Sequence, residues 1–459
     1  MPVPPAPSPF RRELATTLRL AVPLVAANLL QMLVYAIDVV FVARLGSAAL
    51  AAASLATSLF GLVTWCLLGL TGACAPLIAA QLGRRAHAVR EIRRSARMAL
   101  WLALASALPA MALFAWGEQV LLLLGQNPDL ARRAGQFLAI LVWATIPNLM
   151  AGVLRTVVAT LGRPVLATAI TALAILVNAL GNYAFIHGRL GAPALGLDGS
   201  AVSTVITACA MLAAYAAVLR LDRRLARYRL LGRLWRPAWD HLAALLRIGI
   251  PVALIILAEG GLFAGAAFLM GRIGEAELAG HTVALQVASI AFQVPFGLGQ
   301  AATIRVGYHY GAGDRAAIGR AGRAALVLAF GYMALPAAAM ILAPGAVIGL
   351  YVDLSAPQNA AMIGFARQYI VVAAAFQLFD GAQAVLAGAL RGLQDTRIPL
   401  LLALAGYWLF GFLTAITLAF LTPLAGLGVW LGLAVSLVVV AALLGRRWRQ
   451  RERLGLVPA

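Results

Sequence analysis

Three carboxylates lie well inside long apolar runs of the sequence, namely Asp38, Glu259 and Asp380. A charged carboxylate at the depth of a bilayer is costly, and such residues usually face a partner or an aqueous cavity. No arginine lies deep in these runs to pair with them. Because burial disfavours the charged form, each carboxyl would hold a proton or bind a small cation through oxygen atoms. The alternative is that each is neutral and hydrogen-bonds a neighbouring helix.

Polar side chains accompany the first carboxylate at helical spacing. Gln31, Tyr35 and Asp38 share one helical face, because steps of four and three residues stay aligned. In a later apolar run, Asn178 and Asn182 stand four residues apart and share a face in the same way. These residues are candidates for a polar cavity, although hydrogen bonds between helices would explain the same pairs.

The third carboxylate also has polar and aromatic neighbours. Gln377 shares a helical face with Asp380. Phe376 directly precedes Gln377 in the sequence. Aromatic rings such as those of Phe376, Phe292 and Tyr35 are candidates to line an apolar cavity that accepts flat organic cations. Plain packing of these rings is the alternative.

Composition indicates that membrane-spanning helices carry these residues. The chain of 459 residues is 63% hydrophobic and 11% charged, whereas a soluble protein carries roughly 25% charged residues. Apolar runs of about 20 residues span a bilayer as helices, since lipid leaves no water to satisfy a backbone edge. We therefore predict an all-α polytopic membrane protein with twelve helices, at 18–43, 48–80, 96–116, 134–158, 165–187, 197–219, 247–270, 278–305, 321–345, 364–390, 398–421 and 424–445.

The basic residues predict the orientation of the chain. All 36 are arginines, of which 30 fall at the N-terminus, in every second loop and in the C-terminal tail. The other side holds only Arg44, Arg132, Arg133, Arg189, Arg272 and Arg367. Arginine-rich loops stay in the cytoplasm, so both termini are expected there, in a multi-pass protein of the bacterial inner membrane. The net charge of +20 then indicates contact with anionic lipid rather than nucleic-acid binding.

The sequence also repeats itself at an offset of 228 residues, which aligns Arg19 with Arg247 and Pro23 with Pro251. Six spans in each half give both halves the same orientation, with a pseudo-two-fold axis along the membrane normal, an architecture typical of transporters. The predicted parts are an N-terminal six-helix lobe at 1–219, a cytoplasmic Arg-rich linker at 220–246, a C-terminal six-helix lobe at 247–445 and a cytoplasmic tail at 446–459.

Several of these patterns resemble multidrug and toxic compound extrusion (MATE) transporters. The resemblance lies in the repeat, in the stretch from Asp38 to Gly46, in the stretch from Asn178 to Gly188, and in the pattern Gln377-Leu-Phe-Asp380-Gly-Ala-Gln383. The NorM branch is the most similar, because it carries a seventh-span glutamate like Glu259 together with a tenth-span aspartate. The resemblance covers nearly the whole chain.

The resemblance implies two six-helix lobes that open a central cavity to each side in turn and expel cationic, amphipathic compounds in exchange for Na+ or H+. Glu259 and Asp380 would form the cation site of the C-terminal lobe, where they could hold Na+. Asp38 with Asn178 and Asn182 would form the polar cavity of the other lobe. Phe376 departs from relatives that carry a tyrosine there, so a hydroxyl ligand is lost.

Other classes of function fit the sequence less well. A lipid-linked precursor flippase of related architecture is the main alternative, but it would require basic residues in the cavity for a pyrophosphate. An enzyme would require clustered groups, whereas the five histidines are scattered, at His87, His187, His241, His281 and His309. The two related halves and the lack of a ring-type filter disfavour a receptor or channel. We expect a monomer without a cofactor, coupled to an ion gradient.

Overall fold

The structure, a computed structural model, describes residues 8–85, 88–232 and 234–458. His87 and Arg233, which entered the sequence analysis, lie outside these residues. The chain forms two compact units, of which unit 1 comprises Met1–Val25 with Leu254–Ala459 and unit 2 comprises Ala26–Ala253.

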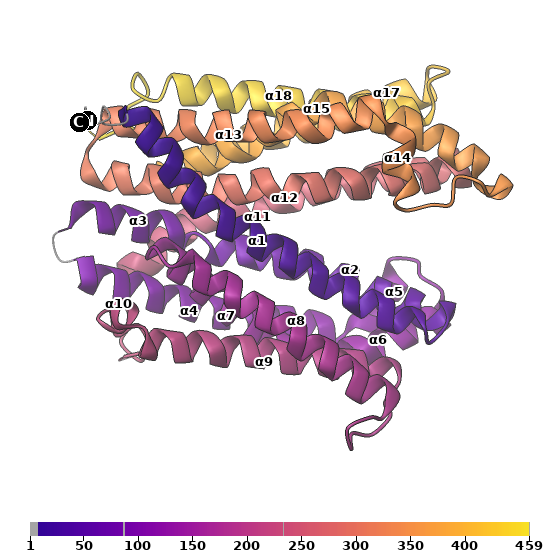
Figure 1. Cartoon of the computed structure of the whole chain (residues 1–459), viewed down its shortest axis with the longest axis horizontal. Helices are drawn as coiled ribbons and strands as arrows, with labels where there is room; N and C mark the ends of the chain where they lie inside the picture. The colour runs from indigo at the N-terminus through magenta and orange to yellow at the C-terminus, as the bar shows by residue number, and fades with distance from the viewer. Residues whose placement is uncertain (1–7, 86–87, 233, 459) are drawn as a thin grey trace, which may run out of the picture. The chain divides into compact units, whose positions relative to one another are not determined.

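Both units are built from helices (Figure 1). The first half of the chain contains α1 (Pro9–Ala43), α2 (Ser47–Thr71), α3 (Cys74–Arg84), α4 (Ala88–Ala115), α5 (Gly117–Leu123), α6 (Pro128–Leu141), η1 (Val142–Ala144), α7 (Thr145–Thr160), α8 (Pro164–His187), α9 (Leu197–Leu221) and α10 (Arg223–Ala226). The second half contains α11 (Trp239–Ile273), α12 (Glu275–Ala312), α13 (Arg315–Leu342), α14 (Pro344–Gly349), η2 (Pro357–Asn359), α15 (Ala360–Gly392), α16 (Arg397–Leu404), η3 (Ala405–Phe412), α17 (Leu413–Phe420) and α18 (Gly426–Arg449).

The prediction of an all-α protein with twelve spans is confirmed, since the described residues contain twelve helical stretches, some of them made of two or three segments, that are long and apolar enough to cross a membrane. Two of the helices begin well before the predicted starts at residues 18 and 247, since α1 starts at Pro9 and α11 at Trp239. The predicted helix 48–80 is two helices, α2 and α3. They meet at Gly72, where a Cβ would lie 2.8 Å from the Leu68 carbonyl oxygen.

The long helices α1 and α11 are each shared between the two units. The chain passes from unit 1 to unit 2 shortly after Pro23 and returns shortly after Pro251. Both crossings obey the 228-residue offset of the repeat. The predicted lobes, 1–219 and 247–445, divide the sequence by its repeat instead, and that division stays a prediction.

The beginning of α1 is anchored to α12 within unit 1. Glu13 accepts two hydrogen bonds from Arg305, at 2.8 Å from Nε and 2.7 Å from Nη2. His309 Nε2 lies 3.3 Å from the same carboxylate. Farther along, Val25 packs against Gly297, where a Cβ would lie 2.6 Å from Val25 Cγ2. A bidentate ion pair and a glycine contact thus fix the first turns of α1.

The beginning of α11 is anchored to α3 and α4 within unit 2. His241 Nε2 lies 2.9 Å from Glu91 Oε2, and its Nδ1 lies 3.0 Å from Ser95 Oγ. Gln81 donates a hydrogen bond to the same Ser95 hydroxyl at 2.8 Å. The preceding linker is fixed to α4 as well, because Arg93 Nε donates to the Tyr228 carbonyl oxygen at 2.7 Å.

The two anchors occupy matching places in the repeat. Glu13 and His241 are separated by the offset of 228 residues, and so are Gln81 and His309. The positions are retained while the chemistry differs, since one anchor contains an arginine ion pair and the other a histidine and a serine. Each anchor holds the start of a repeat's first helix in the unit formed mainly by the other repeat.

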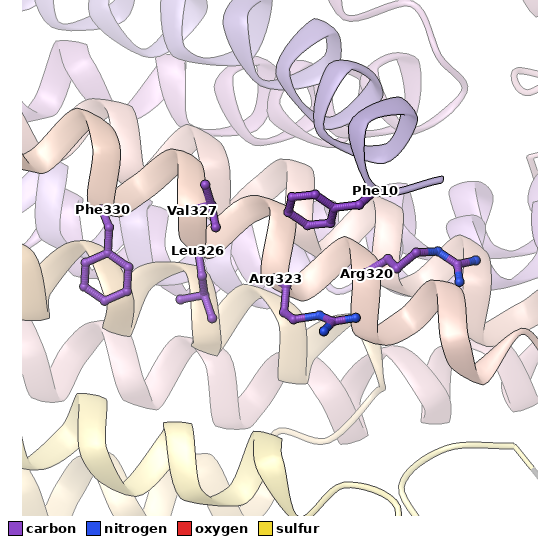
Figure 2. A pocket seen from close by; sticks show the side chains of 6 residues that line it. All are labelled: Phe10, Arg320, Arg323, Leu326, Val327 and Phe330. Carbon is purple, nitrogen blue, oxygen red and sulfur yellow. The ribbon is translucent and has the colours of Figure 1, made fainter. Parts of the chain in front are cut away.

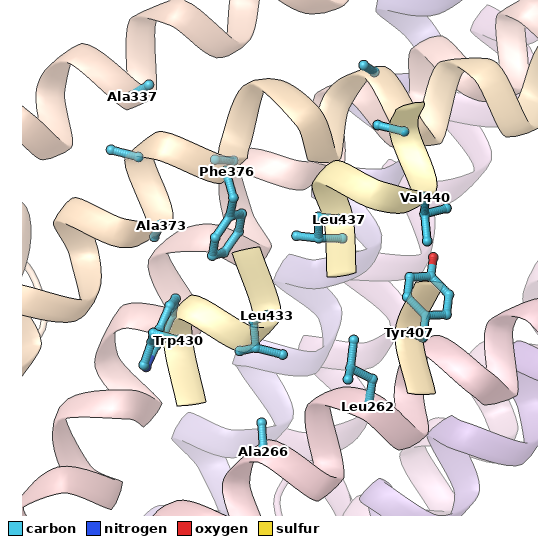
Figure 3. Packing of buried hydrophobic residues seen from close by; sticks show 14 of the residues in the cluster. Leu262, Ala266, Ala337, Ala373, Phe376, Tyr407, Trp430, Leu433, Leu437 and Val440 are labelled. Carbon is cyan, nitrogen blue, oxygen red and sulfur yellow. The ribbon is translucent and has the colours of Figure 1, made fainter. Parts of the chain in front are cut away.

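The cores of both units are apolar and rich in small residues. In unit 1, Trp430 stacks on Tyr369 and Phe376, with ring centroids 5.7 and 5.9 Å apart. Leu433 and Leu437 of α18 continue this cluster toward Tyr407 (Figure 3). Tight packing of this kind fixes the helices that carry the polar residues.

We expect Glu13→Gln to lower the free energy of unfolding by about 3 kcal/mol, because Arg305 would keep its charge in a largely buried site. Only 19% of the Arg305 side chain is exposed. Thermal unfolding of the purified protein in detergent measures the change. The control is Glu452→Gln, which removes a 3.6 Å pair with Arg451 from a side chain that is 62% exposed. Equal losses in the two variants would contradict the anchoring role.

Candidate functional site

The first polar cluster lies in unit 2, where Asp38 of α1 meets two asparagines of α8. Asp38 Oδ1 accepts hydrogen bonds from Asn178 Nδ2 at 3.0 Å and from Asn182 Nδ2 at 2.6 Å. The two asparagines are one helical turn apart, and Asn182 Nδ2 lies 3.2 Å from Asn178 Oδ1. Both are fully buried. The structure thus brings together three residues that are distant in sequence.

One acceptor in this cluster lacks a donor. Asn182 Oδ1 is buried and has no hydrogen-bond partner among the described residues. The neighbouring helix α9 holds the backbone in place, because Ser203 Oγ donates to the Asn178 carbonyl oxygen at 2.9 Å. An unpaired buried oxygen is costly. Together with the Asp38 carboxylate, it offers oxygen atoms to a proton or a small hard cation.

On α1, Gln31 lies two turns and Tyr35 about one turn before Asp38. Tyr35 is exposed and Gln31 is partly exposed. The Gln31 position also matches that of Glu259 in the repeat. Equivalent positions of α1 and α11 therefore carry polar side chains, an amide at Gln31 and a carboxyl at Glu259.

The second polar cluster lies in unit 1, around Glu259 of α11. Gln383 Nε2 of α15 lies 3.2 Å from Glu259 Oε1 and 2.5 Å from the Tyr407 hydroxyl oxygen. Gln383 Oε1 is buried without a hydrogen-bond partner in the described part of the chain. As around Asp38, a carboxylate is met by neutral donors, and a free oxygen remains beside it.

Asp380 and Gln377 lie on the same face of α15, one turn apart. Asp380 is buried, and the charges of Asp380 and Glu259 act on each other. Two nearby carboxylates in a low-dielectric site cannot both stay charged without a proton or cation between them. Gln377 is 0% exposed, and neither its amide nitrogen nor its amide oxygen has a partner among residues 8–85, 88–232 and 234–458.

Tyr407 is the residue that the sequence analysis missed. It lies in η3, a π-helical segment that separates α16 from α17. Such wide turns shift a side chain relative to a regular helix and are frequent at functional sites. Gly406, next to it, packs against Val440 of α18. A tyrosine beside a glycine in an otherwise apolar run was the one available signal.

Comparison with known proteins identifies the family of this chain. The MatE family model matches residues 23–184 and 251–417. The chain belongs to the MatE family. Among MatE relatives, a protein of Mesorhizobium japonicum named "Probable multidrug resistance protein NorM" is 44% identical over 445 residues, covering 97% of this chain and 95% of its own length. "Multidrug resistance protein NorM" of Burkholderia vietnamiensis is 40% identical, covering 97% and 95%. These NorM relatives agree with the branch that the sequence resembles.

Solved MATE structures share the fold. The crystal structure of the eukaryotic MATE transporter AtDTX14 superposes with a TM-score of 0.86 at 21% identity, covering 97% of this chain and 99% of that one. A multidrug resistance MATE family transporter in an outward-facing conformation also gives 0.86, at 19% identity and 97% coverage of both chains. The chain therefore has the fold of these MATE structures.

Two aromatic candidates of this MatE chain lie in different surroundings. Phe376 is buried and stacks on Trp430, so its visible contact is packing. Phe292 of α12 is partly exposed, with its ring centroid 6.0 Å from that of Phe296. A role for either ring in lining a cavity stays a prediction. Phe376 has no hydroxyl group, but Tyr407 contributes one to the cluster around Glu259.

The described residues contain no group of three or more His, Cys, Asp and Glu side chains that could hold a metal ion. A Na+ ion at Glu259 and Asp380 would thus take further ligands from neutral oxygens, of which Gln383 and Tyr407 are the nearest in the Glu259 cluster. Hard cations accept amide and hydroxyl oxygens as ligands. The donor set fits Na+ or a proton.

We expect Gln377→Met to raise the free energy of unfolding by about 1–3 kcal/mol, because it removes two unpaired buried polar atoms at similar volume. Gln383→Met is the matched control on the same helix and is expected to lower it, since its amide bonds to Glu259 and Tyr407. Thermal unfolding in detergent separates the two. A loss of stability in Gln377→Met would show that its amide is satisfied in the folded protein.

Proposed function

We propose that this MatE protein is an antiporter of the bacterial inner membrane, which exports cationic, amphipathic compounds in exchange for Na+ or H+. The observation that carries the proposal is that Asp38, Glu259 and Asp380 lie inside spans without an ion pair among the described residues. The amide hydrogen bonds to Asp38 and Glu259 come from uncharged side chains. No basic side chain in the described part of the chain neutralises these carboxylates, so a proton or an entering cation would do so.

The coupling follows from competition for this charge. A carboxylate in a low-dielectric site is neutralised by a proton, a Na+ ion or an organic cation, and one such partner displaces another. If the bound ion and the bound cargo favour different conformations, each shifts the population toward the state that releases the other. Unit 2 supplies one carboxylate to this exchange and unit 1 supplies two.

The relatives support the class of cargo. Their names describe multidrug resistance proteins, and the exposed Tyr35 lies three residues, about one helical turn, before Asp38. An aromatic face next to a carboxylate attracts an organic cation through both its charge and its apolar body. In this proposal an ion gradient is the driving force, and the arginine distribution supports a cytoplasmic location of both termini.

The alternative, a flippase for lipid-linked precursors, would have to bind a pyrophosphate. The two clusters offer carboxyl, amide and hydroxyl groups, and Asp38, Glu259 and Asp380 would repel an anion. We therefore favour cationic cargo.

We expect Asp38→Asn, Glu259→Gln and Asp380→Asn each to slow ethidium efflux at least about tenfold, a change of roughly 1.4 kcal/mol in the transport barrier. Everted vesicles with either a Na+ gradient or a pH gradient imposed measure the rate and identify the coupling ion. The substitutions are isosteric and remove only the ionisable group.

The control is Asp353→Asn, which changes an exposed loop carboxylate and is expected to leave efflux unchanged. Wild-type rates in all three variants would contradict the coupling role of the carboxylates. Absence of efflux under both gradients would contradict antiport itself.

A further inference from the structure

A cavity of about 470 Å³ lies on unit 1, between the start of α1 and one face of α13. It is lined by Phe10, Arg320, Arg323, Leu326, Val327 and Phe330 (Figure 2). Five of these six residues follow one another down α13 at helical spacing. The cavity shares no lining residue with either carboxylate cluster, and the proposed antiport makes no use of it.

The lining changes from charged to apolar along α13. Arg320 and Arg323 lie near the start of the helix, and Val327 and Phe330 lie one to three turns farther into the span. Val327 is 53% exposed and Phe330 is 44% exposed. On a membrane-spanning helix, exposed apolar side chains of this kind are suited to contact with acyl chains. A phospholipid has the same polarity, with a charged head followed by an apolar chain.

Positive charge is in excess at the charged end. Arg320 has one acidic partner, Asp314, at 3.7 Å. Arg323 donates through Nε to the Gly319 carbonyl oxygen at 3.3 Å and forms no ion pair in the described part of the chain. Arg451 lies next to Gly319 as well. Burial and the charge of Arg323 lower the pKa of Arg451, against the opposing effect of Glu452. A phosphate would relieve this repulsion.

We propose that this groove binds an anionic phospholipid of the cytoplasmic leaflet. Its phosphate lies between Arg320 and Arg323, and one acyl chain follows Val327 and Phe330. Phe10 covers the junction of head and chain. Because Phe10 belongs to the turn of α1 that precedes the Glu13 anchor, the bound lipid also holds the start of α1 against α13.

The test compares lipids on the purified full-length protein. Native mass spectrometry and thermal unfolding are recorded with phosphatidylglycerol, with phosphatidylcholine of the same chains, and with inorganic phosphate. We expect phosphatidylglycerol to be retained and to raise Tm, and the other two to have little effect. Equal stabilisation by phosphatidylcholine, or by inorganic phosphate, would overturn the proposal, because an anionic lipid would not be what the groove recognises.

The double substitution Arg320→Gln with Arg323→Gln is expected to weaken phosphatidylglycerol binding about thirtyfold. This fold-change corresponds to about 1 kcal/mol for each arginine near an anionic surface. Arg449→Gln with Arg453→Gln removes two charges near the C-terminus and is expected to retain wild-type binding. Equal binding by both double variants would overturn the assignment. The wild-type comparison of lipids decides the question even if a variant fails to fold.

Discussion

Hydrocarbon offers no hydrogen bonds, and this constraint governs every polar group that the spans of this protein contain. Asp38 and Glu259 satisfy it with amide donors from other helices, at 2.6–3.2 Å. The amide oxygens of Asn182 and Gln383 remain without donors among the described residues. Each cluster therefore has an acceptor oxygen left over beside a carboxylate, and this spare oxygen supports the proposed exchange of cations.

The sequence predicted most of the fold because lipid leaves few alternatives to a helix. Apolar run lengths located the twelve spans, and Pro23 and Pro251 revealed the repeat. Helix starts were placed too late at α1 and α11, since a charged turn outside the apolar run still forms a helix when Glu13 or His241 is anchored. Hydropathy does not detect such contacts.

The site was predicted in part, for a physical reason. Helical spacing located Asp38 and the Asn178–Asn182 pair separately, but it carries no information about which helix faces which. Their joining, at 2.6 Å and 3.0 Å, is a tertiary contact. Tyr407 was not predicted, because its position depends on the π-helical segment Ala405–Phe412. No residue type reliably predicts such a segment. The Gln31–Glu259 match further shows that a duplicated backbone does not imply duplicated chemistry.

The sharing of α1 and α11 between units has an implication for how such a chain could arise. If each repeat had once been a separate six-helix protein, two copies lending each other the first turns of their leading helix would have formed an interlocked dimer. Fusion of the two copies through the segment now occupied by residues 222–238 would have preserved this exchange of helical turns. If this connection were cut, neither half would contain all the contacts of its own first helix. Glu13 in the first half contacts Arg305 in the second, and His241 in the second half contacts Glu91 in the first.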